Sequence, residues 1–322
     1  KRLTNAEEKT IPKAFADYRQ MLDEVKPQIV AIGPRWLDQH RDMVLAAAER
    51  GCHIYMEKPL CRSPQEADEM EAACKKYDVK LALAHQTAYS PKIQAVKDLI
   101  DAGKLGTILE LRGRGKEDAR GGTEDLWVLG SHVMNLIHTF GGDPQWCFAR
   151  LEEGGKPVDK SHVKEGAEGI GPLAGDTVQA MYGMSGGATG YFGSKRNANG
   201  GRFGLTIFGS KGIVEILTGH LPSVQFLADP AWSPGRSGAK WIPVSSAGAG
   251  AAEPLKDGGL DGGNILAVKD LLHAIEEDRD PECGIYEGRV TIEMICAVFD
   301  SHRTGGPVTW PLKTRVNALS LL

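Results

Sequence analysis

The tripeptide Glu57-Lys58-Pro59 is the first candidate for chemistry in this sequence. It directly follows a short apolar segment, residues 52–56, that we expect to form a buried strand. In open α/β sheets, ligands bind in the crevice beyond the carboxyl ends of the parallel strands. A lysine there can hold a substrate oxygen while hydride leaves the adjoining carbon, and Pro59 restricts the backbone that aims it. The alternative is an ordinary strand-end turn with a solvated lysine.

His132 is the candidate for proton transfer. It lies in the first turn of a helix predicted from about residue 131 to 140. The positive end of the helix dipole disfavours the imidazolium form, so we expect a neutral ring that can accept a proton from an alcohol. The alternative is a histidine that only caps or packs. His138 is six residues further on and does not share a helical face with His132, so no metal site is predicted.

The charged run Lys116-Glu117-Asp118 is a candidate for substrate binding. It follows a strand expected at residues 107–114, which would place it at the mouth of the site. The alternative is a solvated loop, because charge clusters usually lie on the surface.

The first part of the chain has the elements needed to position Lys58. Strands at residues 28–33, 52–56 and 79–84 alternate with helices at residues 38–51 and 63–77. This order predicts a right-handed parallel βαβαβ unit. The Ser63-Pro64-Gln65-Glu66 sequence is a capping box with proline at the first helical position, which marks the start of the second helix.

That unit is only half of a doubly wound dinucleotide-binding sheet. No Gly-x-Gly-x-x-Gly segment lies between a strand and a helix, and the sequence begins at Lys1. We therefore expect the amino-terminal half to be missing, with roughly forty further residues upstream that carry a strand and the glycine-rich turn.

The second part has a different pattern. Strand signals dominate residues 176–244 and predict a largely antiparallel open sheet, whereas residues 245–263 are interpreted as a loop. Helices are predicted from Ser90-Pro91 to Gly103, from Asn264 onward, and at residues 288–303. The fold class is therefore α/β, with a Rossmann-type domain at residues 1–88 and an α+β domain at residues 89–322.

Composition restricts the partners. Of the 322 residues, 41% are hydrophobic and 25% are charged, as in a globular protein, and the net charge of −4 gives no sign of a nucleic-acid surface. No apolar run is long enough to span a bilayer, so no membrane partner is expected. The six cysteines form no CxxC pair and are interpreted as reduced, mostly buried thiols. The cytoplasm is the default location, and a segment that carries an address would belong to the upstream residues that we expect before Lys1.

In combination, several motifs resemble the Gfo/Idh/MocA family of inositol dehydrogenases and glucose–fructose oxidoreductases. The resemblance spans nearly the whole chain. The runs that carry it are Gly33-Pro34 with His40, residues 53–60 around Glu57-Lys58-Pro59, residues 15–22, residues 85–91, Gly121-Gly122 with Gly130-Ser131-His132, residues 203–212, and Gly305-Gly306-Pro307-Val308.

The resemblance implies a Rossmann domain that binds NAD or NADP. Lys58 matches the family's catalytic lysine, and His132 matches its catalytic histidine. The positions that correspond to cofactor contacts are Gly33, Pro34, Arg35, Trp36, His40, Glu57 and Lys58, with His85 and Gln86 near the nicotinamide.

The chain departs from the family pattern around His132. The family often has aspartates four residues before and three residues after this histidine, and these positions are Val128 and Asn135 here. Glu124 and Asp125 are the candidates for a carboxylate that orients the base. Asn135 joins Lys116, Glu117 and Asp118 as an expected substrate contact.

These observations favour an NAD(P)-dependent dehydrogenase that acts on a sugar, polyol or sugar derivative. One alternative is an NAD-dependent glycoside hydrolase that uses transient oxidation. A second is a non-catalytic, sugar-binding member of the fold. The open sheet of the second domain would need a cover on its apolar face, so a homodimer or homotetramer is expected.

Overall fold

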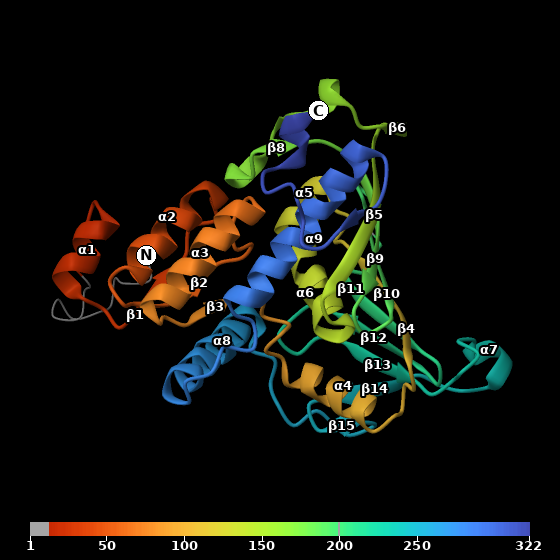
Figure 1. The fold of residues 1–322 in the computed structure, drawn as a ribbon. Helices are drawn as coiled ribbons and strands as arrows, with labels where there is room; N and C mark the ends of the chain where they lie inside the picture. Colours follow the sequence, from red (N-terminus) through yellow and green to blue (C-terminus); the bar gives the residue numbers. More distant parts are fainter. Residues whose placement is uncertain (1–12, 199) are drawn as a thin grey trace.

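The computed structural model describes residues 13–198 and 200–322, and it contains two main sheets with helices packed between them (Figure 1). Lys58 lies just beyond the carboxyl end of the middle strand of the first sheet. The three strands of this sheet are parallel in the order β1 (Ile29–Ile32), β2 (His53–Met56) and β3 (Leu81–Leu83), connected by α2 (Leu37–Ala48) and α3 (Pro64–Tyr77). The predicted βαβαβ unit is therefore confirmed.

Local chemistry explains where α3 begins and ends. The Ser63 hydroxyl accepts a hydrogen bond from the Glu66 amide, and Pro64 occupies the first turn, as the sequence predicted. Asp78 ends the helix in the left-handed conformation. This sheet has three strands among the described residues. They do not support the expectation that the amino-terminal half of the dinucleotide-binding sheet is missing from the chain. Lys1 lies outside the described residues.

Helices from the end of the chain complete the first unit. The helix α8 (Gly259–Glu276) packs on β2 and β3, and α9 (Ile285–Thr304) lies between the two sheets, against α3, α6 and β5 (Figure 1). The prediction of a loop over residues 245–263 is wrong at its carboxyl-terminal boundary, because α8 begins at Gly259 and not at Asn264. Glycines there have low helix propensity, but Gly263 lets α8 approach closely: a Cβ at this position would lie 2.7 Å from Gln86 Cβ.

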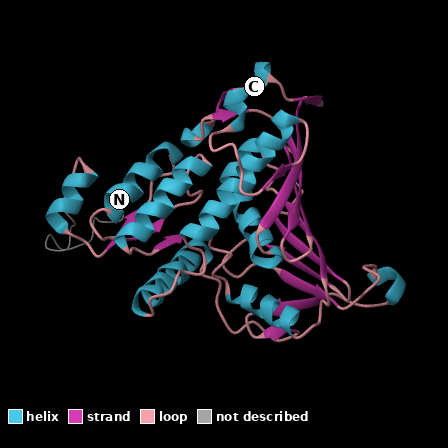
Figure 2. Ribbon diagram, viewed as in Figure 1, coloured by secondary structure: helices cyan, strands magenta, loops and turns pink. Residues whose placement is uncertain are grey.

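The second sheet is large and mostly antiparallel, as predicted (Figure 2). Its strands run in the order β15-β14-β13-β12-β11-β4-β10-β9-β5-β16, and only β4 and β10 pair in parallel. The bounds are β4 (Ile108–Arg114), β5 (Pro144–Glu153), β9 (Thr177–Met184), β10 (Thr189–Lys195), β11 (Gly204–Gly209), β12 (Ile213–Leu217), β13 (Val224–Leu227), β14 (Ile242–Ser245), β15 (Gly248–Ala249) and β16 (Val308–Thr309).

Close packing positions the helix that carries His132. The helix α5 (Thr123–Val128) leads through Leu129 into α6 (Gly130–Gly141), which lies on β4, β10 and β11. Two strand glycines allow this approach: a Cβ on Gly113 would lie 2.4 Å from Val133 Cγ1, and one on Gly190 would lie 3.0 Å from Ile137 Cγ2. The position of α6 is therefore fixed by close packing of its Val133 and Ile137 side chains on the strand glycines.

Smaller elements surround these layers. Among the described residues they are α1 (Tyr18–Val25), α4 (Pro91–Asp101), α7 (Pro234–Ser237), β6 (Lys156–Pro157), β7 (Lys164–Glu165), β8 (Pro172–Leu173) and short 3₁₀ turns at Lys160–His162, Ala167–Gly169 and Ala318–Leu321. All six cysteines are buried and free, as expected. Within residues 13–198 and 200–322, no helix has the length and apolarity needed to cross a membrane.

Candidate active site

Lys58 lies just beyond the carboxyl end of β2. Its side chain points from the first unit, the parallel sheet with its helices, toward the second unit, the large sheet with α5 and α6. Its Nζ donates a hydrogen bond to the carbonyl oxygen of Val128, at the end of α5, over 2.7 Å. Burial lowers the pKa of Lys58 below its ordinary value, and the Arg35 and Arg120 guanidiniums act in the same direction. The lysine is therefore a partly desolvated cation held between the two units.

His132 and His85 form a pair of rings beside Lys58. Their centroids are 5.2 Å apart in an edge-to-face arrangement. Burial, with the neighbouring Lys58 as a smaller cause, lowers the pKa of His85 to about 3. Burial also lowers the pKa of His132 well below its ordinary value, with His85 and Lys58 contributing. Both imidazoles are therefore neutral at physiological pH.

The cause of this neutrality differs from the one that the sequence suggested. The expectation rested on the dipole of a free helix amino terminus. However, α5 leads directly into α6, and the His132 amide already donates to the Leu129 carbonyl over 3.1 Å. Desolvation and the adjacent lysine keep the ring neutral instead. The Nδ1 atom of His132 is buried and has no hydrogen-bond partner among the described residues.

The expected carboxylate that orients His132 is not found at Asp125. This side chain is buried, and its Oδ2 accepts hydrogen bonds from the Ser194 hydroxyl at 2.5 Å and from the Glu117 amide at 3.1 Å. Burial raises its pKa. Since Nδ1 of His132 lacks a partner within the described chain, Glu124 does not orient the ring either. Among these same residues, no group of three or more His, Cys, Asp or Glu side chains is arranged to hold a metal.

The three residues of the charged run 116–118 lie in two different environments, one buried and one partly exposed. Glu117 is fully buried, and its carboxylate accepts from Arg114, from Arg202 and from the Lys195 amide. The expected substrate contact at Glu117 is therefore not available, because the protein's own donors occupy both oxygens. In contrast, Lys116 and Asp118 form a partly exposed pair, 3.3 Å apart, with Arg120 also near Asp118. Since Arg120 affects the pKa of Lys58, this loop lies near the lysine.

Asn135 lies one helical turn after His132, in the protein interior. Its Nδ2 donates to the sulfur of Cys283 over 3.4 Å, and its Oδ1 is buried without a partner among the described residues. Because Asn135 is 1% exposed, its side chain is not accessible for the substrate contact that we expected. Sequence reasoning missed Cys283, whose neighbour in space, Asn135, is 148 residues away in the chain.

The expected cofactor residues occupy the carboxyl ends of the three parallel strands. Gly33 follows β1, and a Cβ placed on it would meet no atom within 4 Å. The following residues, Arg35 and Trp36, are exposed, and Arg35 pairs with Glu168. Gln86 follows β3, and its Nε2 donates to Asn264 on α8 over 2.8 Å. Tyr55 on β2 donates to the same oxygen.

His40 and Glu57 support these strand ends. His40 is fully buried, with Nε2 2.8 Å from the Pro34 carbonyl and Nδ1 3.0 Å from the Pro59 carbonyl. A neutral imidazole carries one proton, so His40 donates to one of these two carbonyls, and the ring packs between the two loops. Its full burial leaves no exposed surface for the expected direct cofactor contact. The Glu57 carboxylate accepts from the Lys58 amide over 3.3 Å. The Lys58–Pro59 peptide bond is cis.

A nicotinamide dinucleotide fits the groups at these strand ends. The open space beside Gly33 admits close approach of a ligand to the backbone. The exposed guanidinium of Arg35 lies two residues further on and pairs with Glu168. Lys58 and His85 lie at the ends of the next strands, and His132 of α6 contacts His85 from the other side of the site. The Nε2 atom of His85 is buried without a partner among the described residues, which leaves a polar group for a ligand to satisfy.

Two family models match the chain. The model described as "Oxidoreductase family, NAD-binding Rossmann fold" matches residues 1–85, and the "GFO/IDH/MocA C-terminal domain" matches residues 93–215. Among curated proteins, the levoglucosan dehydrogenase of Pseudarthrobacter phenanthrenivorans is 28% identical over 228 residues, which cover 62% of this chain and 57% of that protein. The 2,7-anhydro-N-acetylneuraminate hydratase of Mediterraneibacter gnavus is 32% identical over 36% of this chain and 32% of its own length.

Solved structures share the fold. Levoglucosan dehydrogenase in complex with NADH and levoglucosan superimposes with a TM-score of 0.72 at 23% identity, covering 92% of this chain and 83% of that chain. An oxidoreductase domain protein from Kribbella flavida gives a TM-score of 0.71 at 24% identity, covering 92% of this chain and 84% of the other. At these identities the likeness extends to the fold alone.

The depressed pKa of His85 predicts how acid affects stability. In the unfolded chain, this histidine regains its ordinary pKa of 6.5, whereas the folded value is about 3. Between these values the unfolded state binds a proton that the folded state does not, so the free energy of unfolding falls as pH falls below 6.5. At pH 5 the loss from this residue is about 2 kcal/mol. His85→Gln should therefore show a smaller drop in stability between pH 7.5 and pH 5.

Urea unfolding at several pH values measures this effect. His273→Gln, which removes an exposed histidine on α8, is the matched control and should follow the unsubstituted protein. If the free energy of unfolding falls equally with pH in His85→Gln and in the unsubstituted protein, His85 is not held neutral by the fold.

Proposed function

The chain belongs to the Gfo/Idh/MocA family of oxidoreductases, and on this premise we propose that it transfers hydride between NAD or NADP and a sugar, polyol or sugar derivative. The observation that carries the proposal is that Lys58 and His85, at the carboxyl ends of parallel strands, lie beside His132 of α6, with both histidines neutral. The family's NAD-binding domain and the levoglucosan dehydrogenase among the relatives support the cofactor and the substrate class.

Lys58 holds and polarises the reacting oxygen in this proposal. Its ammonium group is partly desolvated, which strengthens its attraction for an oxygen that gains negative charge as hydride leaves. The hydrogen bond to Val128 fixes one of its three protons and leaves the others for the substrate. When bound, the nicotinamide supplies the site that accepts or donates hydride.

His132 exchanges the alcohol proton. Because burial holds its pKa well below the ordinary value, the ring is unprotonated and available as a base at neutral pH. The ring is partly exposed although Nδ1 is buried, so a substrate hydroxyl or a bridging water can reach its accessible side. Phe203 packs edge-on to the ring, with centroids 6.4 Å apart, and helps to keep bulk water away.

Substitution of the two residues tests the proposal. Lys58→Met keeps much of the side-chain stem but removes the charge, so cofactor affinity should change little while hydride transfer falls by on the order of 10²-fold or more. His132→Asn should give a similar loss. Because the two groups act on one oxygen, the double substitution should cost much less than the product of the single losses.

The measurement is single-turnover hydride transfer, followed by nicotinamide absorbance, against a panel of sugars and anhydrosugars. Full activity of either single variant would remove that residue from the mechanism. Release of an aglycone without net change in absorbance would instead support the glycoside hydrolase. Retained sugar binding with no turnover would support the non-catalytic alternative.

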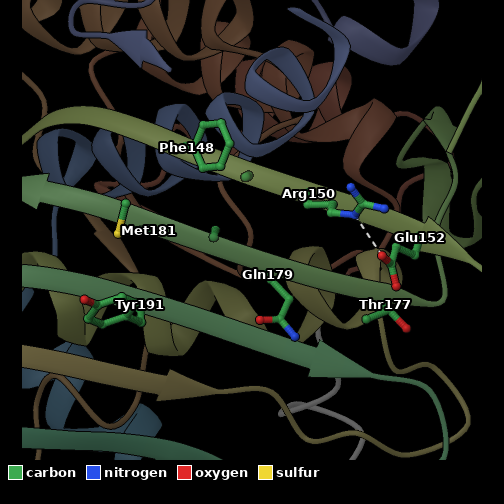
Figure 3. A pocket seen from close by; sticks show the side chains of 9 residues that line it. Phe148, Arg150, Glu152, Thr177, Gln179, Met181 and Tyr191 are labelled. Carbon is green, nitrogen blue, oxygen red and sulfur yellow. Dashed lines mark hydrogen bonds and ion pairs between the residues drawn. The ribbon is translucent and has the colours of Figure 1, made fainter. Parts of the chain in front are cut away.

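We also propose that the outer face of the large sheet joins two copies of the chain. The helices α5, α6 and α9 lie on one side of this sheet (Figure 1). Strand alternation directs Phe148, Met181 and Tyr191 to the other side, where they line a shallow hollow with Gln179, Thr177 and the Arg150–Glu152 pair (Figure 3). Phe148 remains 45% exposed, which favours a partner surface on this face.

Charged substitutions on this face should dissociate the assembly. Phe148→Asp together with Met181→Asp would place two charges in an apolar contact, so light scattering at micromolar concentration should give the mass of a monomer. Leu260→Asp, on the 70% exposed Leu260 of α8, is the matched control and should leave the mass unchanged. A monomeric unsubstituted protein would contradict the proposal.

A further inference from the structure

We propose that Cys283 is a positioning residue that holds His85 as the tautomer with its proton on Nε2. The thiol donates its proton to Nδ1 of His85, so the opposite, unpaired nitrogen carries the N–H group. The catalytic consequence rests on the proposed function. The tautomer itself is a property of the folded chain and can be measured without a substrate.

The backbone of Cys283 is locked to the first sheet. The residue lies between α8 and α9, and its carbonyl accepts hydrogen bonds from the Leu83 amide and the Tyr89 hydroxyl, both over 2.9 Å. Leu83 ends β3, and His85 lies two residues later. The sulfur is therefore held at a fixed distance from the imidazole by backbone contacts on the same strand end. Cys283 is fully buried.

The sulfur of Cys283 lies between two hydrogen-bond partners, and their chemistry decides on which side it accepts and on which side it donates. Nδ2 of Asn135 donates to Sγ over 3.4 Å, and Sγ lies 3.5 Å from Nδ1 of His85. An amide nitrogen can only donate, so the sulfur accepts on that side. Burial raises the pKa of the thiol well above its ordinary value, so the sulfur keeps its proton. That proton is then available for Nδ1, and the chain runs from Asn135 through Cys283 to His85.

The direction of this chain decides what His85 offers at the site. A neutral imidazole carries one proton, so an accepting Nδ1 requires an Nε2–H group. Nε2 is buried and has no partner among the described residues, while the ring lies against His132 and near Lys58. A donor in this position binds an oxygen, such as that of a carbonyl substrate or a carboxamide. In the other tautomer, the same nitrogen would present a lone pair and repel that oxygen.

The tautomer can be read from the ¹⁵N shifts of the ring nitrogens in ¹⁵N-histidine-labelled protein, with the His85 signals identified by their loss in His85→Gln. In the unsubstituted chain, His85 should show a protonated Nε2 and an unprotonated Nδ1. Cys283→Ser keeps a hydroxyl donor and should keep this tautomer. Cys283→Ala should populate the Nδ1–H form. Cys296→Ala, which removes another fully buried cysteine in α9, is the matched control and should change nothing.

A second readout is the rate of hydride transfer. Loss of one hydrogen bond that orders the ring should slow single-turnover transfer by roughly three- to tenfold in Cys283→Ala, with recovery in Cys283→Ser. A protonated Nδ1 in the unsubstituted chain, or an unchanged tautomer in Cys283→Ala, would overturn the proposal. If Cys283→Ala fails to fold, the unsubstituted chain and Cys283→Ser still decide the tautomer. If no sugar is oxidised, the proposed function fails while the NMR result stands by itself.

Discussion

The hydrogen bond from Lys58 Nζ to the Val128 carbonyl joins the strand end of the first unit to the helix pair of the second. Burial of this ammonium group against a carbonyl has two effects. It fixes a cation at the place where an oxygen would react, and its charge adds to the desolvation that keeps both neighbouring histidines neutral. Burial is the larger cause of the neutral histidines, and the position of this one ammonium group adds to it.

The rest of the fold keeps that contact in place. Gly113 and Gly190 let α6 lie directly on the large sheet, so His132 moves only if the helix and the sheet move together. In the first unit, α9 packs between the two sheets. The loop before α9 is attached to β3 by the hydrogen bond that the Cys283 carbonyl accepts from the strand. His85 and His132 are thus positioned by separate elements that meet only in the folded chain, and the distance between their rings reflects the packing of both units.

The sequence predicted those features of the structure that depend on residues close to one another in the chain. The strand end before Lys58, the cap at Ser63 and the helix with His132 all follow from neighbouring residues, and the structure confirms them. Long-range contacts were not predictable in this way. Asp125 was a candidate to orient His132, but it bonds to Ser194, 69 residues away. Asn264 was expected to begin α8, yet contacts with Tyr55 and Gln86 stabilise a helix that begins earlier, at glycines. The strand β5 and the helix α5 carried no signal that sequence reasoning used.

The central claim is that the site holds a neutral imidazole at His132 beside the ammonium group of Lys58. Titration of His132 by NMR, from pH 8 to pH 5, tests it most directly, with the signal assigned by its loss in His132→Asn. The account predicts that the ring remains neutral throughout this range, because burial lowers its pKa well below the ordinary value of 6.5. Protonation of His132 with a midpoint near 6.5 would contradict it.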